Sequence, residues 1–239
     1  MAVDLAPLPA RSVVLSLLLG SHPHRMSSAE LVRAGEHFGV PASTTRVALT
    51  RAVAAGDLHR EDGDYVLGER LARRQQRQDE AVLDAETPWD GSWELAVVVV
   101  AGRPGPERAA LRDRLASYRL AELREGVWTR PANLSRPRGY ADAPVLRCFT
   151  AVPDDDPAAM ASGLWDLRAW AATGRELLDA LGSTKDPAPR LAVAAQVVRH
   201  LAGDPLLPAA LLPHGWPAAQ MRAAYAGYQA ELRALAIGR

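Results

Sequence analysis

The stretch that decides the N-terminal fold is "STTRVALTRAVAAGDLHREDGDYVL", which runs from Ser43 to Leu67. Its first half has two arginines and no acidic residue, and its composition suits a helix that ends at Gly56. Its second half places Asp62-Gly63 between two short apolar segments, a pair typical of the type I′ turn of a β-hairpin. The stretch therefore predicts a helix followed at once by a hairpin with strands at 57–60 and 64–67.

Two further helices are predicted before this stretch. "RSVVLSLLLG" (11–20) is an apolar helix that Gly20 ends, and "SHPHRM" (21–26) is expected to be a loop. Ser27 and Glu30 have the spacing of a capping box and begin a second helix that runs to Phe38. Pro41 suits the first turn of the third helix. Three helices and a hairpin thus follow one another near the N-terminus.

The third helix has one side suited to DNA, because no acidic residue lies between Glu36 and Asp57. An acid-free helix fits a major groove lined by phosphates, and hydroxyl and guanidinium groups contact phosphates and guanine edges. We expect the opposite side, with Thr45, Leu49, Ala52 and Val53, to pack inward. The predicted DNA contacts are Ser43, Thr44, Arg46, Val47, Thr50 and Arg51 on the helix and His59 and Arg60 on the hairpin.

The hairpin would act as a wing beside this helix, but its tip carries Glu61, Asp62 and Asp64. Phosphates repel these carboxylates, so we expect the wing to add little affinity or to pack against protein. The competing interpretation of the third helix is an ordinary exposed helix that happens to lack acids.

The rest of the chain predicts two more regions. A polar helical connector from Glu69 precedes a strand at 93–101, expected to be buried on both faces. An amphipathic helix (107–120) and the strands "GVWT" and "VLRCFTAV" follow, in the β-α-β-β order of a small α/β sandwich. The last third is helical, with a proline-rich break at 204–217. Trp165 and Trp170, expected on one of these helices, favour core packing over a pocket for an aromatic ligand.

Composition excludes several classes of protein. The 239 residues have a formal net charge of zero, so any nucleic-acid site must be a local patch. Cys148 is the single cysteine, which rules out an intramolecular disulfide and suits a cytoplasmic protein. The apolar runs are too short to span a membrane, and the sequence has no P-loop, nucleophile elbow or HExxH motif. We predict no metal site and no cofactor.

The ordered motifs resemble those of PaaX-type transcriptional repressors, the regulators of phenylacetic acid degradation. "RSVVLSLLLG" and "TTRVALTRAVAAGDL" are similar to the family's winged-helix domain. "WDGSWELAVVV", "ALRDRLASYRL" and "EGVWTRP" resemble its middle domain, and "DPLLPAALLPHGWP" (204–217) resembles its C-terminal signature. The resemblance covers nearly the whole chain.

The resemblance implies a dimeric DNA-binding repressor that an aryl-CoA thioester, typically phenylacetyl-CoA, releases from a double-stranded DNA operator. It implies a ferredoxin-like middle domain, similar to CRISPR-associated endoribonucleases that use an aspartate just after the first strand. Here that strand ends "VVVVAGRPG", without a carboxylate. A metal-dependent nuclease is therefore the weaker alternative, a protein-binding winged-helix scaffold is a third, and we expect no enzymatic activity.

A CoA effector requires cations near an apolar or aromatic surface. The loop "TRPANLSRPRGY" (129–140) follows Trp128, and no acid interrupts the sequence between Glu125 and Asp142. A solvated loop whose arginines reflect coding bias is the competing interpretation. The predicted effector contacts are Trp128, Arg130, Arg136 and Arg138.

The predicted fold class is α+β, with an N-terminal winged helix, a ferredoxin-like middle domain and a C-terminal helical domain. The predicted domains are residues 1–86, including the helical connector, residues 87–153 and residues 154–239. We place dimerisation and the effector response in the last of these. Its alanine- and leucine-rich helices can pack closely against a second copy of the chain, so we expect a homodimer.

Overall fold

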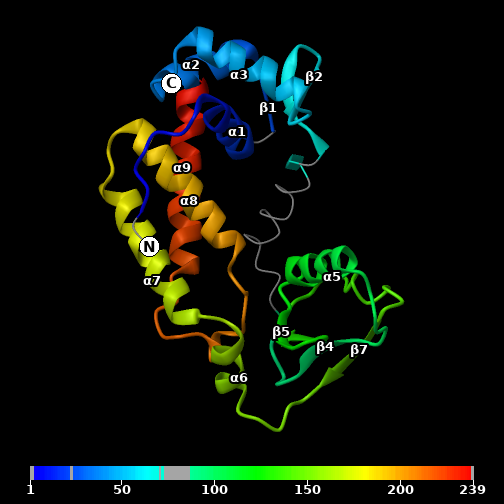
Figure 1. Ribbon diagram of the computed structural model, residues 1–239. Helices are drawn as coiled ribbons and strands as arrows, with labels where there is room; N and C mark the ends of the chain where they lie inside the picture. Colours follow the sequence, from blue (N-terminus) through cyan, green and yellow to red (C-terminus); the bar gives the residue numbers. More distant parts are fainter. Residues whose placement is uncertain (1–2, 22–23, 70, 73–86, 238–239) are drawn as a thin grey trace. The chain divides into compact units, whose positions relative to one another are not determined.

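The computed structural model describes residues 3–21, 24–69, 71–72 and 87–237, and its internal contacts divide the chain into two units (Figure 1). The first unit comprises Met1–Leu83, Ala171–Asp204 and Pro217–Arg239, and the second comprises Asp84–Trp170 and Pro205–Trp216. The C-terminal third of the sequence therefore contributes to both units. Most of the expected connector helix, at residues 70 and 73–86, lies outside the described residues.

The N-terminal part of the first unit is a winged helix, as the sequence predicts. Its helices are α1 (Ala10–Gly20), α2 (Ser28–His37) and α3 (Ala42–Ala54). Its strands are β1 (Arg25–Met26), β2 (Leu58–Glu61) and β3 (Asp64–Leu67), which form an antiparallel sheet in the order β1-β3-β2. The expectation of a loop across residues 21–26 was wrong at its end, since Arg25 and Met26 pair with Val66 and Tyr65 of the wing.

Local sequence explains the ends of these elements. The Ser27 hydroxyl accepts from the Glu30 backbone N–H at 3.2 Å, and the Ser27 N–H donates to the Glu30 carboxylate at 2.7 Å, which confirms the capping box. Asp62 and Gly63 have φ values of 52° and 90°, as a type I′ turn requires.

Helices from the end of the chain complete the first unit. They are α7 (Leu167–Ser183), whose first four residues belong to the second unit, α8 (Pro187–Ala202) and α9 (Ala218–Ile237). Helix α9 packs against α1, α2 and α8, and Figure 1 shows its red ribbon beside the blue N-terminal helices. The buried side chains in this unit include Val14 and Leu18 of α1, Leu31 of α2, Leu49 of α3 and Met221 of α9. The helical C-terminal region is thus confirmed.

The second unit contains an antiparallel sheet in the order β5-β6-β4-β7. Its elements are β4 (Trp93–Val98), α5 (Gly105–Ser117), β5 (Ala121–Arg124), β6 (Val127–Pro131) and β7 (Leu146–Ala151). This strand order and the β-α-β-β start are those of a ferredoxin-like fold, which confirms the expectation. Residues 132–145, between β6 and β7, contain no helix.

Three details of the sequence prediction for this unit were wrong. Strand β5 was missed because "AELR" is short and polar. Strand β4 ends at Val98, whereas the sequence predicted a strand up to residue 101. It is also not buried on both faces, since Leu95 and Val97 are partly exposed and Val99 and Val100 beyond it are 49% and 45% exposed.

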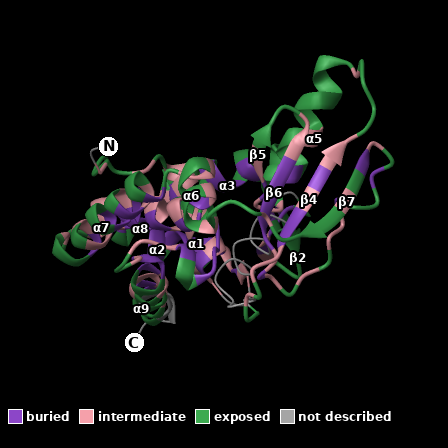
Figure 2. Ribbon diagram, turned by 90° about the horizontal axis from the view of Figure 1, so that it is seen from below, coloured by how far each residue is buried: buried purple, intermediate pink, exposed green. Residues whose placement is uncertain are grey.

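The second unit has two hydrophobic clusters. Ala96, Trp128 and Leu146 of the sheet pack against Leu115 of α5. Trp93, at the start of β4, packs with residues of α6 (Pro157–Leu164), α7 and the 3₁₀ turn η1 (Ala209–Leu211). Figure 2 shows the buried residues of β4 and β6 and the exposed outer surfaces of α5 and β7.

The tryptophans support core packing. Trp165 ends α6 and packs against the Trp93 cluster, whereas Trp170 lies on α7 and stacks on Trp216 at 4.3 Å between ring centroids. The expectation that both lie on one helix was wrong, because the chain turns at Trp165 and Asp166. No helix within the described residues is both long and apolar enough to cross a membrane.

Candidate functional site

Helix α3 presents a continuous exposed side beside the wing. We call the exposed residues Ser43, Thr44, Arg46, Val47, Thr50 and Arg51 the recognition face. Thr45, Ala48, Leu49 and Ala52 are buried on the opposite side. The expected packing side was wrong at Val53, which is 37% exposed, and it omitted Ala48. All six helix residues predicted to contact DNA thus lie on one solvent-facing surface.

A buried polar side chain forms a hydrogen bond near each end of α3. The Thr45 hydroxyl, fully buried, donates to the carbonyl of Pro41 at 3.3 Å in the first turn. At the other end the buried carboxylate of Asp57 accepts from the Arg11 guanidinium, whose Nε lies 3.1 Å away. Arg11 belongs to α1, so this ion pair ties the turn after α3 to the first helix.

The acidic tip of the wing has a counter-charge in Arg25. Arg25 of β1 places its Nε 3.1 Å from Asp64 and its Nη2 3.6 Å from Asp62, and it donates to the carbonyl of Glu61 at 3.1 Å. The guanidinium therefore offsets carboxylates that would otherwise repel phosphate. His59 and Arg60 are exposed on β2, and Arg60 lies over the Tyr65 ring at 4.9 Å and donates to its hydroxyl.

The residues predicted to bind an effector lie in the second unit, and two of them face protein. Trp128 is a core residue with 6% of its surface exposed. Arg130 is fully buried and donates to the carbonyls of Pro131 and Leu206 and to the side chain of Asn133, at 2.9–3.0 Å. Burial lowers the pKa of the Arg130 guanidinium to about 9, which leaves it cationic at neutral pH.

Arg130 has a clear structural role. Leu206 belongs to the proline-rich segment 204–217, and its carbonyl also accepts from Asn133 Nδ2 at 3.1 Å. Leu206 has a φ of 50°, unusual for a residue with a branched side chain. The two donors hold this carbonyl and so fix the segment against the end of β6.

Arg136 and Arg138 lie on either side of a buried carboxylate. Each guanidinium has a nitrogen 3.6 Å from Glu94, whose side chain is 2% exposed. Tyr140 also donates to Glu94, and burial, with this hydrogen bond, raises the pKa of the Tyr140 phenol. The expected loop 129–140 begins inside β6, which ends at Pro131. Residues 129–140 contain no acidic residue, but the pairing of β4 with β6 places Glu94 opposite Arg130.

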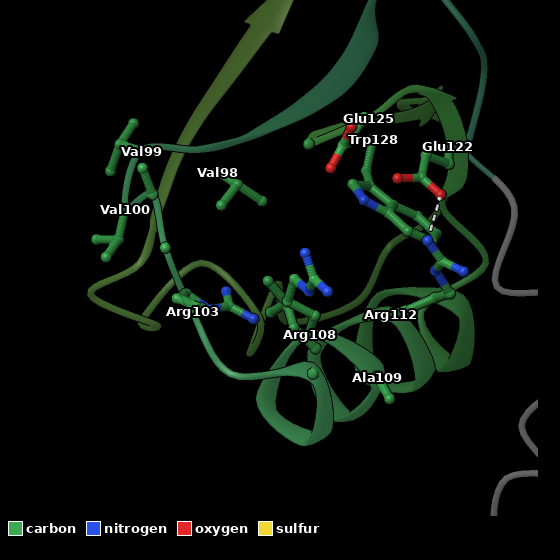
Figure 3. A pocket seen from close by; sticks show the side chains of 15 residues that line it. Val98, Val99, Val100, Arg103, Arg108, Ala109, Arg112, Glu122, Glu125 and Trp128 are labelled. Atoms are coloured by element: carbon green, nitrogen blue, oxygen red, sulfur yellow. Dashed lines mark ion pairs between the residues drawn. The ribbon is translucent and has the colours of Figure 1, made fainter.

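A pocket of about 730 Å³ opens at the end of β4 (Figure 3). The end of β4 and the turn after it, the first half of α5 and the β5–β6 hairpin form its walls. Its charged side chains are Arg103, Arg108, Arg112, Glu122 and Glu125, and Trp128 is the one predicted effector residue that lines it. This site was not predicted from the sequence. Three arginines spaced four and five apart were the available signal.

Potential metal ligands are scattered. Across the described ranges, no three His, Cys, Asp or Glu side chains gather where they could hold a metal ion. Cys148, on β7, is partly buried, and burial raises the pKa of its thiol.

Comparisons with known proteins match the chain in three consecutive segments. Residues 9–71 match the model of the PaaX-like protein family, residues 86–138 match the PaaX protein central Cas2-like domain, and residues 165–237 match the PaaX-like protein C-terminal domain. A solved structure, an uncharacterized protein, Rv0674, from Mycobacterium tuberculosis, is 43% identical over 98% of each chain, with a TM-score of 0.82. A search of curated protein sequences gives no match.

Proposed function

Because the chain belongs to the PaaX-type family of transcriptional regulators, we propose that it is a cytoplasmic, non-enzymatic repressor. In this proposal a homodimer binds a double-stranded DNA operator, and an aryl-CoA thioester such as phenylacetyl-CoA releases it. The recognition face of α3 carries the proposal, because it combines hydroxyl and guanidinium groups with a complete absence of acids. These groups suit both phosphate and base-edge contacts in a major groove.

The two arginines of the recognition face have different proposed roles. Arg46 lies in the first half of α3, where recognition helices contact base edges, and Arg51 lies near its C-terminal end. We propose that Arg46 reads a base and that Arg51 contacts phosphate. His59 and Arg60 add contacts from the wing, where Arg25 partly offsets the charge of the acidic tip.

The effector contacts that we propose are Trp128, Arg130, Arg136 and Arg138. Glu94 already engages Arg136 and Arg138, so an anionic ligand has to displace this carboxylate. Such an exchange would couple ligand binding to the sheet, because Glu94 lies in β4 between β6 and β7. A ligand shifts the repressor only by its preference for one form, and this is roughly 1–3 kcal/mol in regulatory proteins.

A DNA-binding experiment tests the function. Purified full-length protein is incubated with sheared genomic DNA, bound fragments are sequenced, and the recovered site is used in gel shifts at two salt concentrations. Arg46→Ala should weaken binding by about 1–3 kcal/mol and relax the preference at one base. Arg51→Ala should make the slope of log K against log salt concentration shallower, by about the contribution of one phosphate contact. Unchanged affinity in both variants would remove α3 from the interface.

Calorimetry tests the effector separately. Phenylacetyl-CoA should bind the wild type and should bind an Arg136→Ala, Arg138→Ala double variant more weakly. Equal binding by both proteins would exclude the loop as the effector site, and the absence of binding by either would indicate another ligand.

A further inference from the structure

The pocket at the end of β4 contains two guanidinium groups that have no carboxylate partner among the residues that the structure describes. Arg112 pairs with Glu122 at 3.2 Å, and this pair forms one side wall. Within the described parts of the chain, neither Arg103 nor Arg108 has such a partner. Arg103 instead donates from Nη2 to the carbonyl of Glu107 at 2.9 Å.

The Arg103 side chain is incompletely satisfied. Its Nε and Nη1 atoms are covered by protein, and neither has a hydrogen-bond acceptor in the structure. Covered donors on a charged group are costly unless an acceptor reaches them. An acceptor in the pocket would supply one if the Arg103 side chain turned to expose these donors.

The backbone adds positive potential at the same place. Helix α5 begins at Gly105, which lines the pocket, and its N-cap, Pro104, provides no side-chain acceptor for the first turn. In this first turn Pro106 has no N–H and the Arg108 N–H donates to the carbonyl of Pro104 at 3.1 Å. The N–H groups of Gly105 and Glu107 remain, and such groups at a helix start favour an anion. Figure 3 shows the Arg108 side chain rising from α5 into the middle of the pocket, with Arg103 beside it.

The opposite wall is partly apolar. Val98 points into the pocket from the end of β4, and Trp128 lies farther along the same side, next to Glu122 and Glu125 (Figure 3). Leu111 of α5 also lines the pocket. A volume of about 730 Å³ lies within the usual range for small-molecule sites. The pocket therefore combines Arg103 and Arg108 at one side with Val98 and Trp128 at the other, where Glu122 pairs with Arg112 and Glu125 lies at the rim.

We propose that this pocket binds a small organic anion. Its phosphate or carboxylate group contacts Arg103, Arg108 and the first turn of α5, and its apolar part lies against Val98, Leu111 and Trp128. Arginine binds both anions through paired N–H groups, so both fit the cationic side. Any effect of this ligand on DNA rests on the function proposed above, but its binding does not.

The test is calorimetry on the full-length protein without DNA, with phenyl phosphate and phenylacetate as the probes. At least one should bind, and phenyl phosphate should bind more tightly than inorganic phosphate if the apolar wall takes part. Arg108→Gln should weaken binding about tenfold, because it removes a charge-assisted contact. Arg168→Gln is the matched control, since Arg168 is an exposed residue of α7 that does not line the pocket.

A variant that removes a negative charge from the pocket gives a second test, with the opposite expected effect. Glu125 is exposed at the rim of the pocket, so Glu125→Gln should strengthen binding of either anion. Binding of phenyl phosphate alone identifies the anion as phosphate, and binding of phenylacetate alone identifies it as carboxylate. The proposal is overturned if neither probe binds at millimolar concentration or if Arg108→Gln binds as the wild type does. Because the assay contains no DNA, a failure of operator binding leaves this result unaffected.

Discussion

Gly68 lies where the chain leaves the wing and passes the turn after α3. Its N–H donates to the carbonyl of Asp57 at 2.7 Å. A Cβ atom on Gly68 would lie 2.2 Å from the carbonyl oxygen of Gly56 and 3.0 Å from that of Asp57. Both neighbours are backbone atoms, so no side-chain rotation can relieve the clash.

We therefore expect Gly68→Ala to lower the free energy of unfolding by about 2–3 kcal/mol, the range for overpacked sites. Urea denaturation followed by circular dichroism measures the change. Gly182→Ala is the control, because a Cβ there meets nothing within 4 Å and alanine is favoured in a helix. Equal midpoints for the two variants would contradict the close contact.

Residue patterns in the sequence predicted the recognition face but not its electrostatic surroundings. Helical spacing places Arg46 and Thr50 on one side of α3, and a local pattern suffices for that. The Arg25–Asp64 pair joins residues 39 positions apart, and the Glu94–Arg136 pair depends on how β4 and the loop after β6 come together. No local pattern reports such partners, so the acidic wing tip was an open question and the loop 129–140 looked purely basic.

At the scale of elements, α2 depends on its capping box. The pKa of Glu30 is lowered, first because the Ser27 backbone N–H donates to its carboxylate, and also through the Ser27 hydroxyl and Arg33. The ionised carboxylate therefore stabilises the fold above the unfolded pKa of Glu30, and this contribution is lost as pH falls through the lower folded value. Helix α2 packs against α3, so the cap supports the recognition face.

We predict that Glu30→Gln lowers the free energy of unfolding by roughly 0.3–1 kcal/mol at pH 7. The difference from the wild type should shrink as pH is lowered toward 3, because the wild-type carboxylate then becomes neutral. Denaturation at intervals between these pH values measures this. Glu36→Gln, near the C-terminal end of the same helix, should show no such loss. A deficit for Glu30→Gln that does not change with pH would rule out the charged cap.

The wing gives a second prediction at this scale. Without Arg25, Asp62 and Asp64 would face the phosphates with no counter-charge. Arg25→Ala should weaken operator binding by roughly 1 kcal/mol, or about fivefold, and less at high salt. Gel shifts measure both effects. Asp62→Asn should do the reverse, so equal effects of the two variants would contradict the electrostatic role.

The length of a helix or strand largely decides whether it could be predicted from the sequence. The helical C-terminal region was predicted, because the apolar periodicity of a helix such as α9 extends over five turns. Strands β1 and β5 were missed, because two and four residues are too few to show an alternating pattern. Strands β2 and β3 also have four residues each, but the Asp62-Gly63 turn between them predicted them. The pocket beside α5 depends on β5 and the β5–β6 hairpin, so it was missed with them.

At the scale of the whole molecule, the C-terminal third is shared between the two units. Helices α8 and α9 pack with the winged helix, whereas Pro205–Trp216 joins the sheet unit, where Arg130 and Asn133 hold the carbonyl of Leu206. The sequence suggested one helical domain after residue 153. The division of the chain into two units depends on which buried residues contact one another, and sequence patterns do not give these contacts. The three-domain division therefore stays a prediction.

The exposed side of α9 is relevant to the proposed dimerisation. One side of this helix is buried against its neighbours through Met221, Tyr228 and Leu232. The opposite side exposes small residues at spacings of three and four, namely Ala219, Ala223, Ala226, Ala230 and Ala234. Small residues let two helices approach closely, so this side supports the proposed homodimer.

We expect the wild type to sediment as a dimer, at twice the 25.7 kDa mass of the chain, at micromolar concentration. Ala226→Glu should shift it to the monomer, because the symmetric contact would bury two unpaired carboxylates. The control is Ala172→Glu, which adds the same charge at an exposed site on α7. Ala226→Glu should also bind the operator much more weakly, since a monomer engages a single half-site. A monomeric wild type, or dimers of both variants, would exclude α9 as the interface.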